Sequence, residues 1–355
     1  MSASPFDHPF LSGLLGDAEI SAHFSAEADI AAMIRFEIAL AKAEATEGVI
    51  GQDAADAIGQ GLAGFAPDLA ALSQGAARDG VVIPGLVKAM RAAVGEPHGD
   101  KVHFGATSQD AIDTSLALRL GAVLAVFETR LQNLIAMVDR LEAEQGAVEV
   151  MAHTRMQAAI PIPASRKIVS WRMPLERHFE RLEAVKRDML VLSFGGAAGT
   201  LEKLGGKGPA VRDRLAELLG LAAIEHPRHS ERDGHAELAN WLSLVTGSLG
   251  KMGQDIALMA QSEVGEVKLA SGGGSSAMPH KQNPVGAEVL VTLGRFNATL
   301  VSGMHQSLVH ENERSGAAWT LEWMLLPQMA FATGAALRTA SQLLDGLQFQ
   351  QRDPK

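Results

Sequence analysis

Apolar side chains recur every three or four residues over residues 108–145, and this stripe is the most regular pattern in the chain. Its members are Leu116, Leu120, Val123, Phe127, Leu131, Leu134, Val138 and Leu141. Side chains at this spacing share one face of an α-helix. The stripe therefore predicts a helix that is much longer than the average helix of a globular protein and is packed along its length.

Similar patterns predict helices over about 26–47, 163–192, 231–268, 284–309 and 317–346. No alternation of apolar and polar residues is long enough to predict a strand. Helices of this length bury their apolar faces by packing side by side at crossing angles of about 20°. We therefore predict an all-α protein built as a long-helix bundle.

Four glycines, at positions 247, 250, 253 and 265, fall inside the helix predicted over 231–268. Glycine destabilises the interior of a helix unless another backbone comes close at that point. The glycines therefore predict a tight helix–helix contact, which could lie between subunits.

The first hundred residues carry shorter patterns than the rest of the chain, and they end in Gly95-Glu-Pro-His-Gly99. Glycine and proline at this density are typical of a domain boundary. We predict an N-terminal helical domain over 1–100, a central long-helix bundle over 101–346 and a tail over 347–355.

The composition and charge of the chain exclude several classes of function. The chain has 355 residues and a net charge of −10 without a basic run, which argues against nucleic acid as a partner. An anionic ligand would therefore need local positive groups. Cysteine and tyrosine are absent, so thiolate and phenol chemistry are excluded. No signal sequence and no apolar run of about 18 residues is found, and we expect a cytoplasmic protein without a membrane segment.

The segment from Ser271 to Pro284 reads SGGGSSAMPHKQNP and is the strongest candidate for chemistry. Glycines and serines form a loop that can take positive φ angles. Asn283 can cap the helix that follows, and Pro284 suits a first helical turn. With Lys281 beside a helix N-terminus, the loop predicts an anion site that carries a nucleophile or base. A glycine-rich linker would have a similar composition.

Two further polar segments precede predicted helices. In the segment His103-Phe-Gly-Ala-Thr-Ser-Gln-Asp, the side chains of Thr107, Ser108 and Asp110 could simply cap the long helix. The segment from His153 to Pro161 leads into a helix bounded by proline. Each segment alone is a weak indication of a site.

Together the three segments resemble the signatures of the fumarase/aspartase superfamily, in the same order. Gly274–Pro284 fits Gly-Ser-Ser-x-Met-Pro-x-Lys-x-Asn-Pro, and the earlier segments resemble Thr-Ser-x-Asp-x-x-x-Thr and Thr-His-x-Gln-x-x-x-Pro. The variant Gly-Ala-Thr-Ser-Gln-Asp after Val-His, and the segment Glu313–Trp323, look most like the branch that lactonises 3-carboxy-cis,cis-muconate. The chain departs from the family in having Arg155 in place of the usual histidine. It also ends soon after the last long helix, so we expect it to lack the extra C-terminal helical domain of many relatives.

The resemblance implies a reversible β-elimination. It makes Ser275 the base that exchanges the proton alpha to a carboxylate, with Lys281 favouring its alkoxide and Asn283 positioning the carboxylate. His103 would contact a carboxylate or relay a proton, unless it is a capping or core histidine. Arg314 is a candidate for a further carboxylate, unless it forms a surface salt bridge. The remaining predicted substrate contacts are Thr107, Ser108, Thr154, Arg155, Gln157, Ser276 and Met278.

Arg155 bears on the choice of reaction. A hydroxide or amine leaving group needs a general acid, and arginine does not give up its proton near neutral pH. A carboxylate leaving group needs only charge stabilisation, which a guanidinium provides. Arg155 therefore favours the cycloisomerase, in which one carboxylate adds across a double bond of the same molecule. Alternatively, His153 supplies the acid.

Two other functions remain open. A lyase that releases fumarate, with adenylosuccinate lyase nearest, shares the histidine upstream of Thr-Ser. A catalytically silent structural homologue is the second, although an intact Ser275, Lys281 and Asn283 argue against it. The resemblance implies a small tricarboxylate as substrate, no cofactor, and a homotetramer in which each site combines the three segments from different chains.

A cluster of histidines and carboxylates after residue 225 looks like a metal site. It comprises His226, His229, Glu231, Asp233 and His235. We interpret Ser230-Glu-Arg-Asp233 as a capping box, and a second histidine one helical turn away is missing. We therefore predict no metal.

Overall fold

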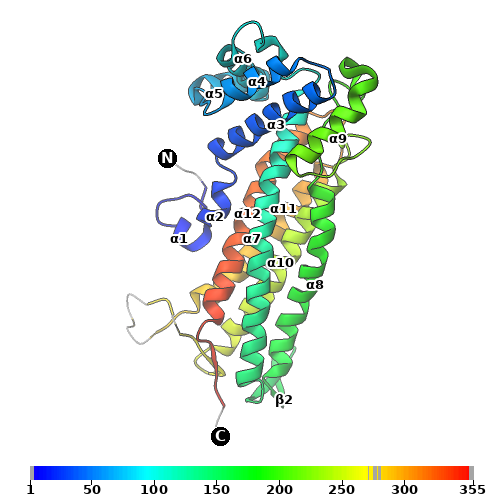
Figure 1. Ribbon diagram of the computed structural model, residues 1–355. Coiled ribbons are helices and arrows are strands. Elements are labelled where there is room, and N and C mark those ends of the chain that lie inside the picture. Colours follow the sequence, from blue (N-terminus) through cyan, green and yellow to red (C-terminus); the bar gives the residue numbers. More distant parts are fainter. Residues whose placement is uncertain (1–3, 271, 275–277, 279–280, 352–355) are drawn as a thin grey trace.

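The computed structural model describes residues 4–270, 272–274, 278 and 281–351. Within these residues five long helices lie side by side (Figure 1). They are α7 (Ser108–Gln145), α8 (Ser165–Met189), α10 (Asp233–Met259), α11 (Val285–Gln306) and α12 (Ala317–Leu344). Each begins and ends close to a predicted helix, so the all-α, long-helix prediction is confirmed.

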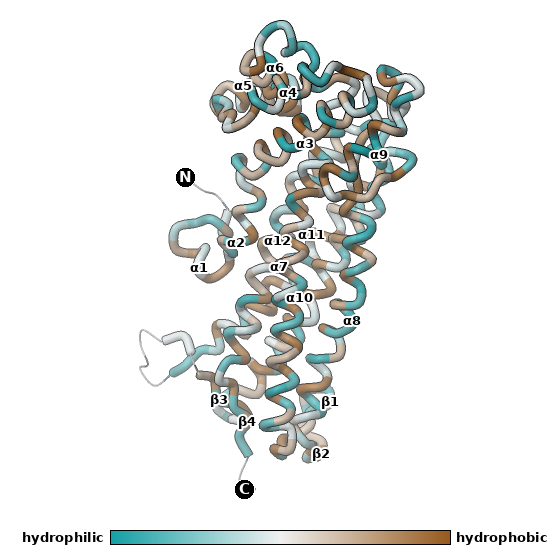
Figure 2. Tube along the Cα trace, viewed as in Figure 1, coloured by the Kyte–Doolittle hydropathy of each residue, from teal (hydrophilic) through white to brown (hydrophobic). Residues whose placement is uncertain are grey.

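The apolar stripe on α7 forms the centre of the bundle. Its side chains from Leu120 to Val138 are 0–1% exposed and pack against α8, α10 and α12. Figure 2 shows apolar residues recurring along each long helix between polar ones. α7 has 38 residues, and at 1.5 Å per residue it is about 57 Å long. Groups at its two ends therefore cannot share one small-molecule site.

The glycine prediction is confirmed for the contact between α10 and α11. A Cβ atom on Gly253 would lie 2.6 Å from the carbonyl oxygen of Ala287, and one on Gly294 would lie 2.8 Å from that of Thr246. The tight contact lies within one chain. The predicted helix was too long, however, because α10 ends before Gly265, which lies in a turn with φ 61°.

A second, smaller core lies at one end of the bundle. It is built by α3 (Ala26–Thr46), α4 (Gln52–Leu62), α5 (Leu69–Asp79), α6 (Ile83–Val94) and α9 (Gly208–Leu219), with the short helices η1 (Gly99–Lys101) and η2 (Glu202–Lys207). Phe36 of α3 packs here against Phe194. Residues beyond 190 thus share a core with the first hundred, and the boundary at residue 100 stays a prediction. Two short helices, α1 (Ser12–Leu15) and α2 (Ala18–Ala22), lie against the bundle.

Two small sheets were missed by the sequence analysis. β1 (Glu149–Thr154) and β2 (Gln157–Pro163) form an antiparallel hairpin, and β3 (Val267–Lys268) pairs with β4 (Gln348–Phe349). Nearly every residue of β2 is exposed, so the hairpin has no buried face to produce an alternating pattern. Among the described residues, no helix is both long enough and apolar enough to cross a membrane.

Candidate active site

The N-terminus of α7 is held by a buried carboxylate. Asp110 accepts the backbone N–H of Thr107 at 3.0 Å, so the capping interpretation of these two residues is confirmed. Asp110 also accepts the N–H groups of Gly195 and Gly196, both at 2.9 Å, and lies 2.8 Å from Nε2 of His229. Because both oxygens of Asp110 accept hydrogen bonds from these groups, Asp110 fixes the loop that leads into the helix.

His103 lies just before this helix end, beside a cavity of about 330 Å³. The cavity is also lined by Lys88 and Arg91 of α6 and by Ser108, the first residue of α7. Nδ1 of His103 is 2.6 Å from Oε1 of Glu37. Burial by itself lowers the pKa of His103, but the charge and hydrogen bond of Glu37 raise it above its ordinary value. This cavity is suited to an anion because it is lined by two cations, Lys88 and Arg91, by the imidazole of His103 and by the N-terminus of α7.

Arg314 lies at the same end of the bundle. Its Nε donates to Oε1 of Gln109 at 2.9 Å, and its Nη2 donates to the carbonyl oxygen of Ala197 at 3.3 Å. Neither contact is with a carboxylate, so these bonds are not the surface salt bridge considered as an alternative. Arg314 also lines a cavity of about 780 Å³ together with Trp319 and residues of α12.

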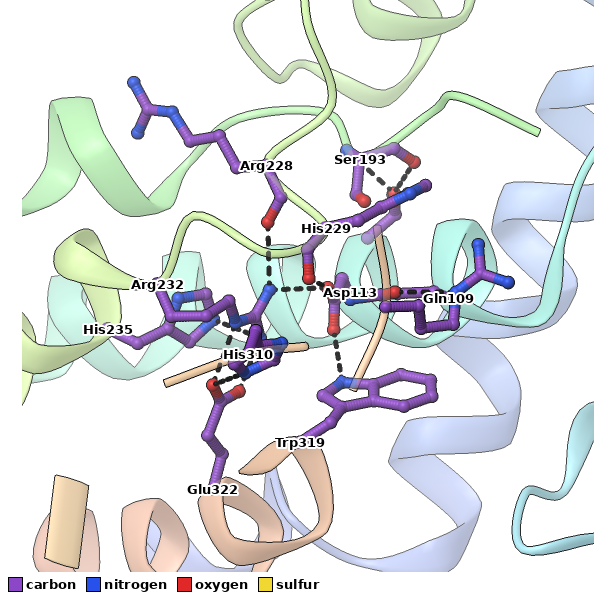
Figure 3. Close-up of polar contacts among 12 residues, drawn as sticks. Gln109, Asp113, Ser193, Arg228, His229, Arg232, His235, His310, Trp319 and Glu322 are labelled. Carbon is purple, nitrogen blue, oxygen red and sulfur yellow. Dashed lines mark hydrogen bonds and ion pairs between the residues drawn. The ribbon is translucent and has the colours of Figure 1, made fainter. Parts of the chain in front are cut away.

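A buried polar network lies behind Gln109 (Figure 3). Nε2 of Gln109 donates to Asp113 at 3.1 Å, and Asp113 accepts from Nη1 of Arg232 at 2.7 Å and from Nε1 of Trp319 at 3.0 Å. Arg232 makes a bidentate pair with Glu322, at 2.8 and 2.5 Å. Burial raises the pKa of Asp113, but the charges of Arg232 and His235 and the hydrogen bonds from Arg232 and Gln109 together outweigh burial and keep this pKa below the ordinary value. The network therefore links α7, α10 and α12 behind Arg314.

Two histidines of the metal-like cluster, His229 and His235, contact buried polar groups instead. His229 contacts Asp110, and Nε2 of His235 lies 3.1 Å from Nη2 of Arg232. Burial, and then the charge of Arg232, lower the pKa of His235 to about 3. The predicted capping box is wrong, since α10 begins at Asp233 without a side-chain cap. Among the described residues no group of three or more histidines and carboxylates is arranged to hold a metal.

The second signature segment forms the turn of the β1–β2 hairpin, rather than the lead into a helix that we predicted. Thr154 pairs with Gln157, and both residues between them, Arg155 and Met156, have positive φ angles of 49° and 68°. Two consecutive positive φ angles in a two-residue loop are typical of a type I′ turn, a conformation that residues such as arginine and methionine rarely adopt. His153 and Arg155 are exposed, and they line a cavity of about 410 Å³.

Backbone hydrogen bonds join the two sides of the third segment. Gly273 and Asn283 exchange two backbone hydrogen bonds, each of 2.8 Å, and the N–H of Lys281 donates to the carbonyl oxygen of Met278 at 3.0 Å. α11 begins at Val285, so Pro284 occupies the N-cap position and not the first turn, and the predicted cap by Asn283 is not formed. Ser275 and Ser276 lie outside the described residues.

A single chain keeps the first signature segment apart from the second and third. His103, Ser108 and Arg314 lie at the end of the bundle where α7 and α12 begin, whereas the hairpin follows the far end of α7 (Figure 1). The third segment lies beside the C-terminal end of α12, where a Cβ atom on Gly346 would be 2.7 Å from that of Ala270. The separation agrees with the predicted sharing of sites between chains.

Sequence reasoning missed Glu37, Lys88 and Arg91. A signal for Glu37 was present, because the residues three and four positions away on either side are all apolar: Met33, Ile34, Leu40 and Ala41. A carboxylate inside an apolar stripe indicates a buried partner. No comparable signal marks Lys88 or Arg91, which are ordinary basic residues on a surface helix until His103 is placed beside them.

Comparison with known proteins places the chain among lyases. The profile of the protein family described as "Lyase" matches residues 17–299. A 3-carboxy-cis,cis-muconate cycloisomerase of Pseudomonas aeruginosa is 40% identical over 337 residues, covering 93% of this chain and 73% of that protein. One from Bradyrhizobium diazoefficiens is 38% identical over 345 residues, covering 96% and 76%. The crystal structure of the 3-carboxy-cis,cis-muconate lactonizing enzyme from Pseudomonas putida superimposes with a TM-score of 0.91 at 36% identity, over 96% of this chain and 77% of that one.

Proposed function

The chain belongs to the lyase family of the fumarase/aspartase superfamily, and we propose that it is a cycloisomerase that lactonises 3-carboxy-cis,cis-muconate to 4-carboxymuconolactone. This reaction belongs to the β-ketoadipate route of aromatic catabolism, and we place it in the cytoplasm. The observation that carries the proposal is Arg155, exposed at the tip of a strained turn where relatives that need a general acid have histidine. A guanidinium can stabilise a carboxylate that attacks or leaves, but it cannot protonate one.

The chemistry follows from the substrate. One carboxylate oxygen forms a C–O bond to a carbon of a double bond, and the electron pair of that double bond moves toward the carbon alpha to another carboxylate. That carbon then takes a proton from Ser275, which acts as acid in this direction and as base in the reverse. Because nucleophile and acceptor belong to one molecule, proximity supplies much of the rate.

The three carboxylates of the substrate need local cations as partners, because the protein has a net charge of −10. His103 with the α7 N-terminus, Arg314, Arg155 and Lys281 are the groups that we assign to them. We assign Lys281 to the negative charge that develops on Ser275 as it gives up its proton, because both residues belong to the same segment. Thr107, Ser108, Thr154 and Gln157 supply neutral hydrogen bonds.

We further propose that the site is completed by other chains of a homotetramer. Helix α7 alone separates His103 from the hairpin by about 57 Å, which is far beyond the size of a tricarboxylate. Long bundles commonly associate through their exposed helix faces, and closed symmetry would generate equivalent sites.

The test is the ultraviolet absorbance of 3-carboxy-cis,cis-muconate mixed with the purified protein. Lactonisation breaks the conjugated diene, so the absorbance should fall with the native protein and stay constant with a folded Ser275→Ala variant. Adenylosuccinate is run in parallel. If fumarate is released from adenylosuccinate and the absorbance of the muconate does not change, the protein is a lyase and not a cycloisomerase.

A further inference from the structure

Glu37 is a buried carboxylate whose side chain faces the candidate site from α3. The side chain is 1% exposed, and Oε1 lies 2.6 Å from Nδ1 of His103, which is itself 12% exposed. Oε2 has no hydrogen-bond partner among the described residues. A buried carboxylate that is bonded mainly to one imidazole is costly unless that imidazole carries a positive charge.

The backbone of His103 is fixed in a conformation that favours this contact. His103 has φ 63°, in the left-handed region that residues with a Cβ atom rarely adopt. It lies between η1 and α7, and its ring contacts Glu37 of α3 just before the helix begins. With Nδ1 bonded to Glu37, Nε2 is the ring nitrogen left for a ligand in the cavity lined by Lys88 and Ser108.

The charges around His103 come from three elements. Glu37 on α3 and Asp110 on α7 favour the imidazolium, whereas Arg91 on α6 and burial oppose it. Asp110 already accepts hydrogen bonds from Thr107, Gly195 and Gly196, and it contacts His229. Glu37 is therefore the carboxylate that is bonded directly to the His103 ring.

We propose that Glu37 is a positioning residue that keeps His103 in its charged form, with Nε2–H directed to a substrate carboxylate in this cavity. The inference rests on the proposed function only for the identity of that carboxylate. In the reaction, Nδ1–H of His103 stays bonded to Glu37, and no proton moves between them. A charged donor adds the attraction of opposite charges to the hydrogen bond with a carboxylate, so the dyad would anchor one end of a tricarboxylate.

Glu44 provides a matched control on the same helix. It lies one heptad beyond Glu37, is 0% exposed, and neither of its carboxylate oxygens has a hydrogen-bond partner among the described residues. Burial, and then the charge of Glu37, raise the pKa of Glu44 to about 9, so it is neutral at pH 7. Glu44→Gln is thus a buried, isosteric change that removes no charge.

The first test measures the titration of His103 without any substrate. The rings of histidine are ¹³C-labelled in deuterated full-length protein, and the His103 signal is assigned by its loss in His103→Gln. In Glu37→Gln we expect the midpoint to fall by at least about one pH unit, as for loss of an adjacent opposite charge. Glu44→Gln should titrate like the native protein. An unchanged midpoint in Glu37→Gln would overturn the proposal, whatever reaction the protein catalyses.

The second test is the pH profile of kcat/KM for the muconate. Activity that needs charged His103 is lost as pH rises through its midpoint, so this high-pH limb should move down in Glu37→Gln by the shift seen in the titration. Glu37→Asp should restore part of it, and Glu44→Gln should leave it in place. A shifted titration with an unmoved limb would show that the charged form of His103 is not used in binding or turnover, and would overturn the assignment.

Discussion

At the scale of single residues, two of the proposed site residues, His103 and Arg155, have an unusual backbone conformation. His103, Arg155 and Met156 all have positive φ angles. Such conformations persist only where the surrounding structure enforces them, and they gather at functional sites. Arg155 is the residue that separates the proposed lactonisation from a lyase reaction.

Replacing Arg155 by leucine should remove the stabilisation of the attacking carboxylate. A charge-assisted contact contributes about 1.5–3 kcal/mol, so we expect kcat/KM to fall about 10- to 150-fold. Arg155→Lys should recover part of this loss because it keeps the charge without the bidentate geometry. Glu149→Gln, on the exposed face of the same hairpin, is the control. Full activity in Arg155→Leu would contradict the assigned role.

The sequence proposed candidate site residues but did not predict their partners in the fold. Signature spacing identified His103 and Arg314, but Glu37 and Gln109, which hold them, come from contacts between residues far apart in the chain. The capping box at Ser230 and the cap at Asn283 failed for a similar reason. At Asn283 the backbone hydrogen bonds with Gly273 took precedence over the local pattern, and at Ser230 the helix begins only at Asp233, after Arg232, which pairs with Asp113 and Glu322.

At the scale of elements, the helices were predictable because their apolar faces are buried along their whole length. The α7 stripe needs no information beyond its own periodicity. The β1–β2 hairpin was not predictable, since its strands are exposed and its turn is made by Arg155 and Met156 instead of the Asn-Gly pair typical of type I′ turns.

The contact between α10 and α11 offers a matched pair of glycines. A Cβ atom on Gly253 would lie 2.6 Å from a carbonyl oxygen, whereas one on Gly247 meets no atom within 4 Å. Gly253→Ala should lower the free energy of unfolding by about 1–3 kcal/mol through overpacking. Gly247→Ala should leave it unchanged or raise it, because alanine favours a helix by about 1 kcal/mol. Thermal unfolding of the two variants measures the difference, and equal melting temperatures would refute the packing argument.

The buried network makes the protein sensitive to acid. The pKa of His235 is lowered to about 3 in the fold, whereas an unfolded histidine binds its proton near about pH 6.5. Between these values the unfolded state binds more protons, so stability falls as pH falls from about 6.5. Asp113, whose pKa is lowered, adds a further loss below about pH 4. Melting temperatures from pH 8 to 4.5 should therefore decline, and His235→Gln should flatten the curve. An equal decline in that variant would exclude His235 as its cause.

Loss of Arg232 should be more damaging than loss of either partner's charge. Its guanidinium is 2% exposed and pairs with both Asp113 and Glu322. Arg232→Met leaves two buried carboxylates without a cation, which costs about 3–5 kcal/mol. Denaturant unfolding of Arg232→Met and Glu322→Gln measures the free energy of unfolding of each variant. A larger decrease in Glu322→Gln than in Arg232→Met would show that Arg232 is not the main stabilising residue of the network.

At the scale of the whole molecule, the bundle holds the first signature segment at one end and the second and third toward the other. No local pattern within the segments predicts this separation. The length of α7, which the sequence did predict, is what makes the separation unavoidable. We therefore expect catalysis to need segments from different chains.

Mixing two inactive variants tests this claim most directly. His103→Gln and Ser275→Ala alter different segments, and each should lactonise the muconate poorly alone. When equal amounts are unfolded and refolded together, about a quarter of the composite sites should receive both intact segments and recover activity. Native mass spectrometry of the mixture confirms that mixed oligomers form. Mixed oligomers without recovered muconate turnover, or a fully active monomer of the native chain, would contradict a site shared between chains.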